Sequence, residues 1–166
     1  MHHRVWTFVN LALIGFSIVY IWFFRPHTTS VLVWSQLFAQ AAILLFFINI
    51  NMYFVFLLIR KTSVRKVKIR LAKISRFLMK WHIKMALLGT LAIVGHAAIN
   101  LSKLAPIIGF FHVKVLTGYF AFALLLVTLF AGYLRHKRAS GFRRRFHLIS
   151  AMIFLLAFLL HMFTWV

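Results

Sequence analysis

The chain contains five apolar stretches that are each long enough to form a membrane-spanning helix. They lie near residues 5–24, 31–59, 81–101, 111–134 and 146–166. The hydrocarbon core of a bilayer is about 30 Å thick, which takes roughly 20 helical residues to cross. The sequence therefore predicts an all-α, polytopic membrane helix bundle. It is expected to have five transmembrane helices within a single domain over residues 1–166.

The charged residues are all cations: the chain has 20 Lys and Arg, no Asp or Glu, and no Cys. This excludes paired carboxylates for acid/base catalysis, carboxylate sites for calcium or magnesium, and thiolate sites for zinc. We assign no catalytic residue. A basic chain can bind nucleic acid, but 64% of the residues are hydrophobic. The cations beside the apolar stretches already have a role at the membrane surface, so no nucleic-acid partner is expected.

Most of the cations fall in two clusters, one between residues 60 and 84 and the other between 135 and 145. The positive-inside rule then places the N-terminus, the basic loop 60–80 and the second cluster in the cytoplasm of a multi-pass cell-membrane protein. Both clusters also predict contact with the anionic head groups of membrane lipids. Within residues 60–80 the cations alternate with apolar residues, which favours an amphipathic helix on the inner membrane surface.

Four of the nine histidines form two pairs with the same spacing. His82 and His96 are fourteen residues apart in the third stretch, and His147 and His161 are fourteen apart in the fifth. Fourteen helical residues rise about 21 Å and complete nearly four turns. The two imidazoles of each helix therefore share one side, near opposite membrane faces. Because both helices run from inside to outside, His82 matches the depth of His147, and His96 matches that of His161.

Two imidazoles that face each other at one depth provide the axial ligands of a bis-histidine haem. We therefore predict two stacked b-type haems, with His82, His96, His147 and His161 as iron ligands. Gly89 lies midway between the two histidines of the third stretch, where a missing side chain lets a flat macrocycle approach. Cations near the two levels are expected to pair with the haem propionates, namely Lys84 and Arg145 and, less directly, Lys80, Arg143, Arg144, Lys103 and Lys114.

Other roles for these histidines stay open. A single histidine in a membrane helix usually forms a hydrogen bond with a neighbouring helix. A proton relay would use the same residues, although it lacks the acidic partners that are common in proton pumps. A metal-ion transporter is disfavoured, because sites about 21 Å apart cannot share one ion. His112 is a rival outer haem ligand, since it lies near the level of His96.

The second half of the chain resembles a known family. The segment W-H-I-K-M-A-L-L-G-T-L-A-I-V-G-H, the following T-G-Y-F-A-F-A-L-L-L, and R-R-R-F-H-L-I-S-A-M-I-F-L-L-A-F-L-L-H carry the likeness. They resemble the membrane domain of the ferric reductase and NADPH oxidase superfamily and related reductase-like membrane subunits. The resemblance implies the same four ligands, His82, His96, His147 and His161. Cytochrome b of respiratory bc complexes has similar spacing.

This chain departs from that family in two respects. The family's membrane domain usually has six helices, whereas five are predicted here. No Gly-rich dinucleotide-binding motif occurs in the sequence. The electron donor is therefore expected to be a quinol or a separate protein, such as an acidic flavoprotein or dehydrogenase subunit docked on the cytoplasmic face.

The leading hypothesis is transmembrane electron transfer through two haems, from a quinol or flavoprotein donor to an acceptor on the opposite face. Whether the chain is itself an oxidoreductase, of the ferric or quinone reductase type, stays open. A first alternative is a haem-carrying membrane anchor of a dehydrogenase that exchanges electrons with a quinone. A second, from a different class, is a haem-free transporter or lipid-binding membrane protein.

Overall fold

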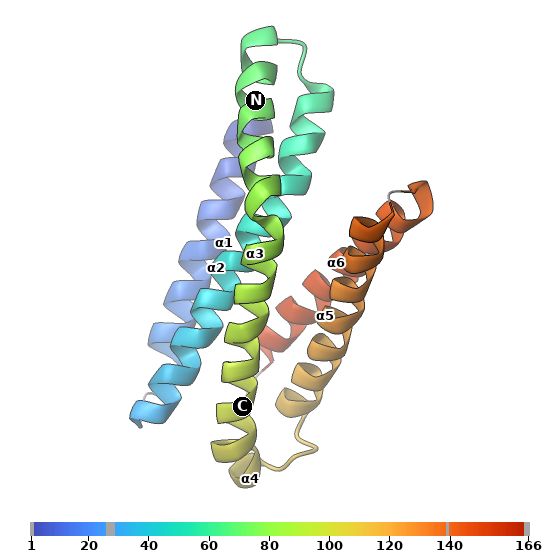
Figure 1. The fold of residues 1–166 in the computed structure, drawn as a ribbon. Helices are drawn as coiled ribbons and strands as arrows, with labels where there is room; N and C mark the ends of the chain where they lie inside the picture. The colour runs from blue at the N-terminus through green and yellow to red at the C-terminus, as the bar shows by residue number, and fades with distance from the viewer. Residues whose placement is uncertain (1, 26–28, 139, 165–166) are drawn as a thin grey trace. The chain divides into compact units, whose positions relative to one another are not determined.

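The regular structure of the chain is helical throughout the part that the structure describes. The structure, a computed structural model, describes residues 2–25, 29–138 and 140–164. Every regular element in these ranges is a helix, which confirms the all-α class. In chain order they are α1 (His2–Phe24), α2 (Ser30–Lys61), α3 (Arg65–Lys103), α4 (Ala105–Ile108), α5 (Val113–Lys137) and α6 (Gly141–Phe163) (Figure 1).

Four of these helices, α2, α3, α5 and α6, are long and apolar enough to cross a membrane. Large apolar side chains cover their outer surfaces. Leu91 of α3 is 68% exposed and Leu156 of α6 is 67% exposed, an exposure that water would oppose and lipid would accept. A multi-pass membrane protein in contact with lipid follows. α1 is 23 residues long and largely apolar, and its role as a fifth span stays a prediction. The end of the last predicted span, residues 165–166, lies outside the described residues.

Residues 60–80, predicted as a cytoplasmic basic loop that contains an amphipathic helix, are largely helical. α2 continues to Lys61, and α3 begins at Arg65 and runs without a break for 39 residues to Lys103. Residues 65–80 contain no glycine or proline and are rich in lysine, arginine and leucine, all good helix formers. The apolar stretch begins only after these charged residues, but the helix runs through both. A helix was predicted here, and its placement on the membrane surface stays a prediction.

The described chain divides into two compact units, residues 1–100 and 101–166. In the first unit, α2 supplies most of the buried side chains, among them Ala42, Ile43 and Phe47. Two aromatic rings of α2 pack against glycines of α3. A Cβ built on Gly89 would lie 3.3 Å from the Phe46 ring, and one built on Gly95 would lie 3.2 Å from the Phe38 ring. Both separations are shorter than an ordinary carbon–carbon contact of about 3.5–4.0 Å, so these glycines let α2 and α3 approach closely.

In the second unit, α5 and α6 form an antiparallel helical hairpin. α6 buries Ser150, Phe154 and Ala157 at alternating steps of three and four residues. The facing stripe of α5 buries Ala121, Leu125, Thr128 and Ala131. This is the spacing at which one side of a helix recurs every seven residues. Because fourteen is twice seven, His147 and His161 belong to the same stripe of α6.

Each helix of the hairpin places a cation on the C-terminal end of the other. Lys114, in the first turn of α5, donates from Nζ to the carbonyls of His161 (2.5 Å) and Thr164 (3.0 Å) at the end of α6. Arg143, in the first turn of α6, donates to the carbonyl of Leu134 near the end of α5 (3.0 Å). The last carbonyls of a helix lack intrahelical partners and carry partial negative charge. In a chain without carboxylates, backbone carbonyls therefore serve as partners for cations.

Candidate functional site

The two histidines of α6 each lie against a glycine of α5. A Cβ built on Gly132 would be 3.2 Å from Cε1 of His147, and one on Gly118 would be 3.1 Å from Cε1 of His161. Any other residue at these positions would have to push the ring aside. Gly118 and Gly132 are fourteen residues apart, like the histidines they face. The hairpin therefore has the same contact, an imidazole of α6 against a glycine of α5, at two positions along its length.

The sequence analysis did not single out Gly118 or Gly132, although a signal was present. Each glycine lies as far before the α5–α6 connection as its histidine lies after it. An antiparallel hairpin brings residues at equal distances from the turn to the same level. The shared spacing of fourteen residues, combined with that symmetry, would have paired Gly132 with His147 and Gly118 with His161.

Hydrogen bonds fix the protonation pattern of both α6 imidazoles. Nδ1 of His147 lies 3.2 Å from the carbonyl oxygen of Thr128, which can only accept, so Nδ1 carries the hydrogen. Nδ1 of His161 lies 3.2 Å from Oγ1 of Thr117. That hydroxyl donates its own hydrogen to the carbonyl of Lys114 (3.0 Å), so it accepts from His161. In both rings the lone pair is therefore on Nε2.

His96 of α3 shows the same pattern in the first unit. Its Nδ1 lies 3.0 Å from the carbonyl oxygen of Ser35 on α2, which makes Nδ1 the donor. Nδ2 of Asn100 lies 3.1 Å from Nε2 and 3.2 Å from Nδ1 of the same ring, so the Ser35 carbonyl is the contact that leaves the lone pair on Nε2. Asn100 also donates to Oγ of Ser35 (2.8 Å). His96 is thus held in a polar cluster between α2 and α3.

His82 and Gly89 lie on the same seven-residue stripe of α3 as His96. His82 is half-buried and Gly89 is buried. In this structure the group that Gly89 accommodates is the ring of Phe46. The predicted role of Gly89 beside a macrocycle stays a prediction.

The predicted propionate partners differ in what they contact. Lys84 is exposed and places Nζ 4.8 Å from the centre of the Trp81 ring, a cation–π contact. Arg145 is exposed in the first turns of α6. Lys114 and Arg143, which the sequence also offered for propionates, are engaged with helix-end carbonyls.

His112 has a structural role at the start of α5. It is the N-cap residue, and its Nδ1 accepts a hydrogen bond from the backbone N–H of Lys114 (3.2 Å). The ring hydrogen of a neutral imidazole is then on Nε2. This is the opposite tautomer from His96, His147 and His161. As the N-cap, His112 has its hydrogen on Nε2, whereas those three have a lone pair there.

The described residues contain no group of three or more His, Cys, Asp or Glu side chains that could hold a metal ion. A pair of imidazoles on an iron already held by a porphyrin needs no such group. The histidine pairs therefore remain the candidate site within the described part of the chain.

Comparison with known proteins adds no assignment: the chain matches no protein-family model, no curated protein and no solved structure.

Proposed function

We propose that the chain transfers electrons across the cell membrane by holding two b-type haems. His82 and His147 would bind one iron, and His96 and His161 the other. The fold supporting this transfer would have five spans with its N-terminus in the cytoplasm. When bound, such haems supply one-electron carriers whose irons have no open coordination position.

The observation that carries the proposal is the orientation of the imidazoles. A histidine that binds a metal through Nε2 usually donates its Nδ1–H to a carbonyl, carboxylate or water, which fixes the ring and raises the basicity of the ligand. His147, His161 and His96 each have an acceptor beside Nδ1, namely Thr128 O, Thr117 Oγ1 and Ser35 O. This arrangement at three of the four proposed ligands supports the haem proposal, although Nε2 of His96, which would bind iron, also lies 3.1 Å from Nδ2 of Asn100.

The chain's own residues would have three tasks. The glycines Gly118 and Gly132 set the depth at which each α6 ring can lie. The Nδ1 acceptors keep Nε2 in the form that binds iron. Exposed cations such as Lys84 and Arg145 are available to carboxylates that a haem brings, and the chain has no carboxylate side chain to compete for them.

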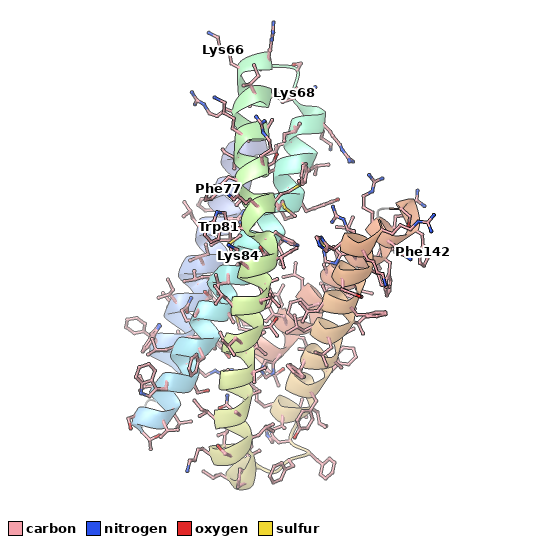
Figure 2. The ribbon with its side chains drawn as sticks, viewed as in Figure 1. Lys66, Lys68, Phe77, Trp81, Lys84 and Phe142 are labelled. Atoms are coloured by element: carbon pink, nitrogen blue, oxygen red, sulfur yellow. The ribbon has the colours of Figure 1, made fainter. Side chains whose placement is uncertain are left out.

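The electron donor would be an acidic protein, a flavoprotein or dehydrogenase subunit, or alternatively a quinol. Lys66, Lys73 and Lys80 recur every seven residues along the N-terminal part of α3 and are all exposed. Figure 2 shows Lys66 and Lys68 near the start of this helix and Phe77, Trp81 and Lys84 farther along it. A row of like charges attracts an oppositely charged partner, and the attraction weakens as salt screens it.

The ligand assignment is tested by removing the histidines in pairs. His82→Ala with His147→Ala is expected to halve the haem content and leave one set of low-spin b-type bands. His96→Ala with His161→Ala should also leave one haem, but with a different midpoint potential. The matched control is His112→Ala with His136→Ala, which should keep both haems. Two haems in either ligand double variant would contradict the pairing.

A further inference from the structure

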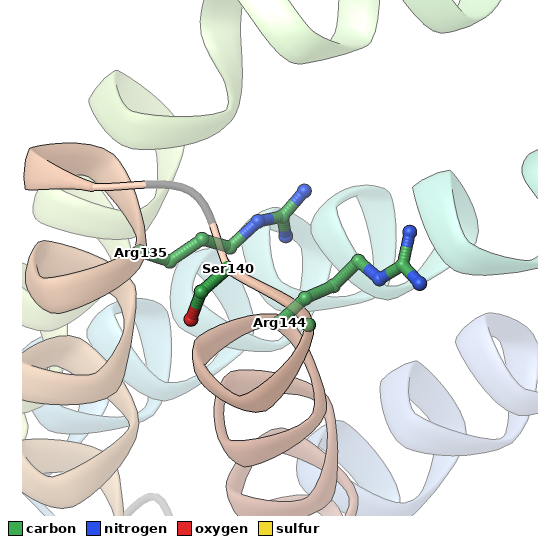
Figure 3. Close-up of a pocket in the computed structure, with 4 residues that line it drawn as sticks. Arg135, Ser140 and Arg144 are labelled. Atoms are coloured by element: carbon green, nitrogen blue, oxygen red, sulfur yellow. The ribbon is translucent and has the colours of Figure 1, made fainter.

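The end of the α5–α6 hairpin contains a pocket of about 330 Å³, lined by Arg135, Ser140, Gly141 and Arg144. Arg135 comes from the last turn of α5 and Arg144 from the first turns of α6. Figure 3 shows their guanidinium groups extending from the two helices to the same side of Ser140. The pocket thus combines two planar cationic groups from different elements in one small space.

Two other polar residues at this end, Ser140 and Arg143, form hydrogen bonds within the chain. Oγ of Ser140 accepts a hydrogen bond from the backbone N–H of Arg143 (3.2 Å) and thereby caps α6. Arg143 itself turns toward the end of α5 and donates to the carbonyls of Leu134 and Arg138. Arg135 and Arg144 are the two arginines that line the pocket.

The ligand of such a pocket should be an anion from outside the chain. Each guanidinium offers five N–H donors in a planar fork that matches the oxygens of phosphate. The chain contains no Asp or Glu that could pair with either arginine. Gly141 adds open space, since a Cβ built on it would have no atom of the described structure within 4 Å.

The surroundings favour a phosphate that is attached to a lipid. The pocket lies at one end of two helices that are each apolar enough to cross a membrane. Phe142, next to Gly141, is 78% exposed (Figure 2). Apolar side chains such as Phe, together with Lys and Arg, are typical of helical segments at the boundary between lipid and water.

We propose that this pocket, formed by Arg135, Gly141 and Arg144, binds the phosphate group of an anionic phospholipid. Arg144 is also one of the cations that the sequence offers to a haem propionate, and lipid binding can be measured whether or not haem is bound. Inorganic phosphate has the same chemistry, so the experiment includes it as a competing ligand.

The test measures phosphatidylglycerol binding to the full-length, detergent-solubilised protein by native mass spectrometry. Arg135→Gln and Arg144→Gln should each raise the dissociation constant by on the order of tenfold, because each removes a fork of charge-assisted hydrogen bonds. Gly141→Leu should weaken binding to a similar extent by filling the pocket without changing the charge. The matched control is Arg138→Gln, which removes a neighbouring charge outside the pocket lining and should weaken binding by about fivefold at most.

Two results would overturn the proposal. Equal effects of Arg135→Gln, Arg144→Gln and Arg138→Gln, with no effect of Gly141→Leu, would reduce the binding to general surface charge. Displacement of phosphatidylglycerol by millimolar inorganic phosphate would overturn the lipid assignment in favour of a soluble phosphate. Far-UV circular dichroism identifies a variant that fails to fold, and the two arginine variants test the site independently of Gly141→Leu.

Discussion

Gly118 and Gly132 are expected to resist substitution because they make room for imidazoles. An alanine Cβ would lie 3.1 Å from Cε1 of His161 or 3.2 Å from Cε1 of His147. An ordinary contact is about 3.5–4.0 Å, so each ring or helix must move by roughly 0.5 Å. Such overpacking typically costs about 1–3 kcal/mol, and the better helix propensity of alanine returns up to about 1 kcal/mol.

Gly15 of α1 provides the control, because a Cβ there would have no atom of the described structure within 4 Å. Gly15→Ala should gain up to about 1 kcal/mol of unfolding free energy without any overpacking cost. Gly118→Ala and Gly132→Ala should therefore fall below Gly15→Ala by about 1–3 kcal/mol. The assay is unfolding in mixed micelles by SDS titration, followed by circular dichroism.

A double-mutant cycle separates the imidazole from other neighbours. If His161 is what Gly118→Ala pushes against, the cost of Gly118→Ala should largely disappear in a His161→Ala background. The same holds for Gly132→Ala with His147→Ala. If Gly118→Ala and Gly132→Ala are as stable as Gly15→Ala, or if their costs persist without the histidines, the role assigned to the two glycines is refuted.

Three further predictions concern the acceptor beside His161, the cation at the end of α6 and the exposed lysine row of α3. Thr117→Val removes the acceptor beside Nδ1 of His161 and should lower the affinity of the outer haem about 10- to 100-fold while leaving the inner haem bound. Haem titration measures this, and an equal loss of affinity for both haems would count against the role of Thr117. Lys114→Met removes the cation on the end of α6 and should lower the unfolding free energy by about 1–2 kcal/mol, whereas Lys73→Met, which removes an exposed cation in the N-terminal part of α3, should change it little. Similar stability of the two variants in the SDS titration would argue against the cap. The rate of electron transfer from an acidic donor protein should fall steeply as the salt concentration rises. The rate should depend less on salt when Lys66, Lys73 and Lys80 are replaced by glutamine, and a wild-type rate that is insensitive to salt would exclude docking on these lysines.

The sequence predicted the features that hydropathy and periodicity control. Long apolar stretches specify spanning helices, and four of the five have a counterpart long enough to cross a membrane. The fourteen-residue spacing implied that His147 and His161 share one side of a helix, and they lie on one stripe of α6.

What the sequence analysis missed depends on neighbouring helices. A helix was predicted within residues 60–80, but not that it continues without a break into the third span as α3. The closeness of Gly118 to His161 depends on the register of the hairpin, and the contact of Gly89 with Phe46 depends on which helix covers that side of α3. Lys114 finds its partners only where the end of α6 meets the start of α5.

The central claim is that the four histidines hold haem, and a reduced-minus-oxidised visible spectrum with haem quantified per chain tests it most directly. Protein purified in detergent from haem-replete cells should show sharp low-spin b-type bands at two haems per chain. A colourless protein would contradict the proposed function, and a single haem would contradict one of the two histidine levels.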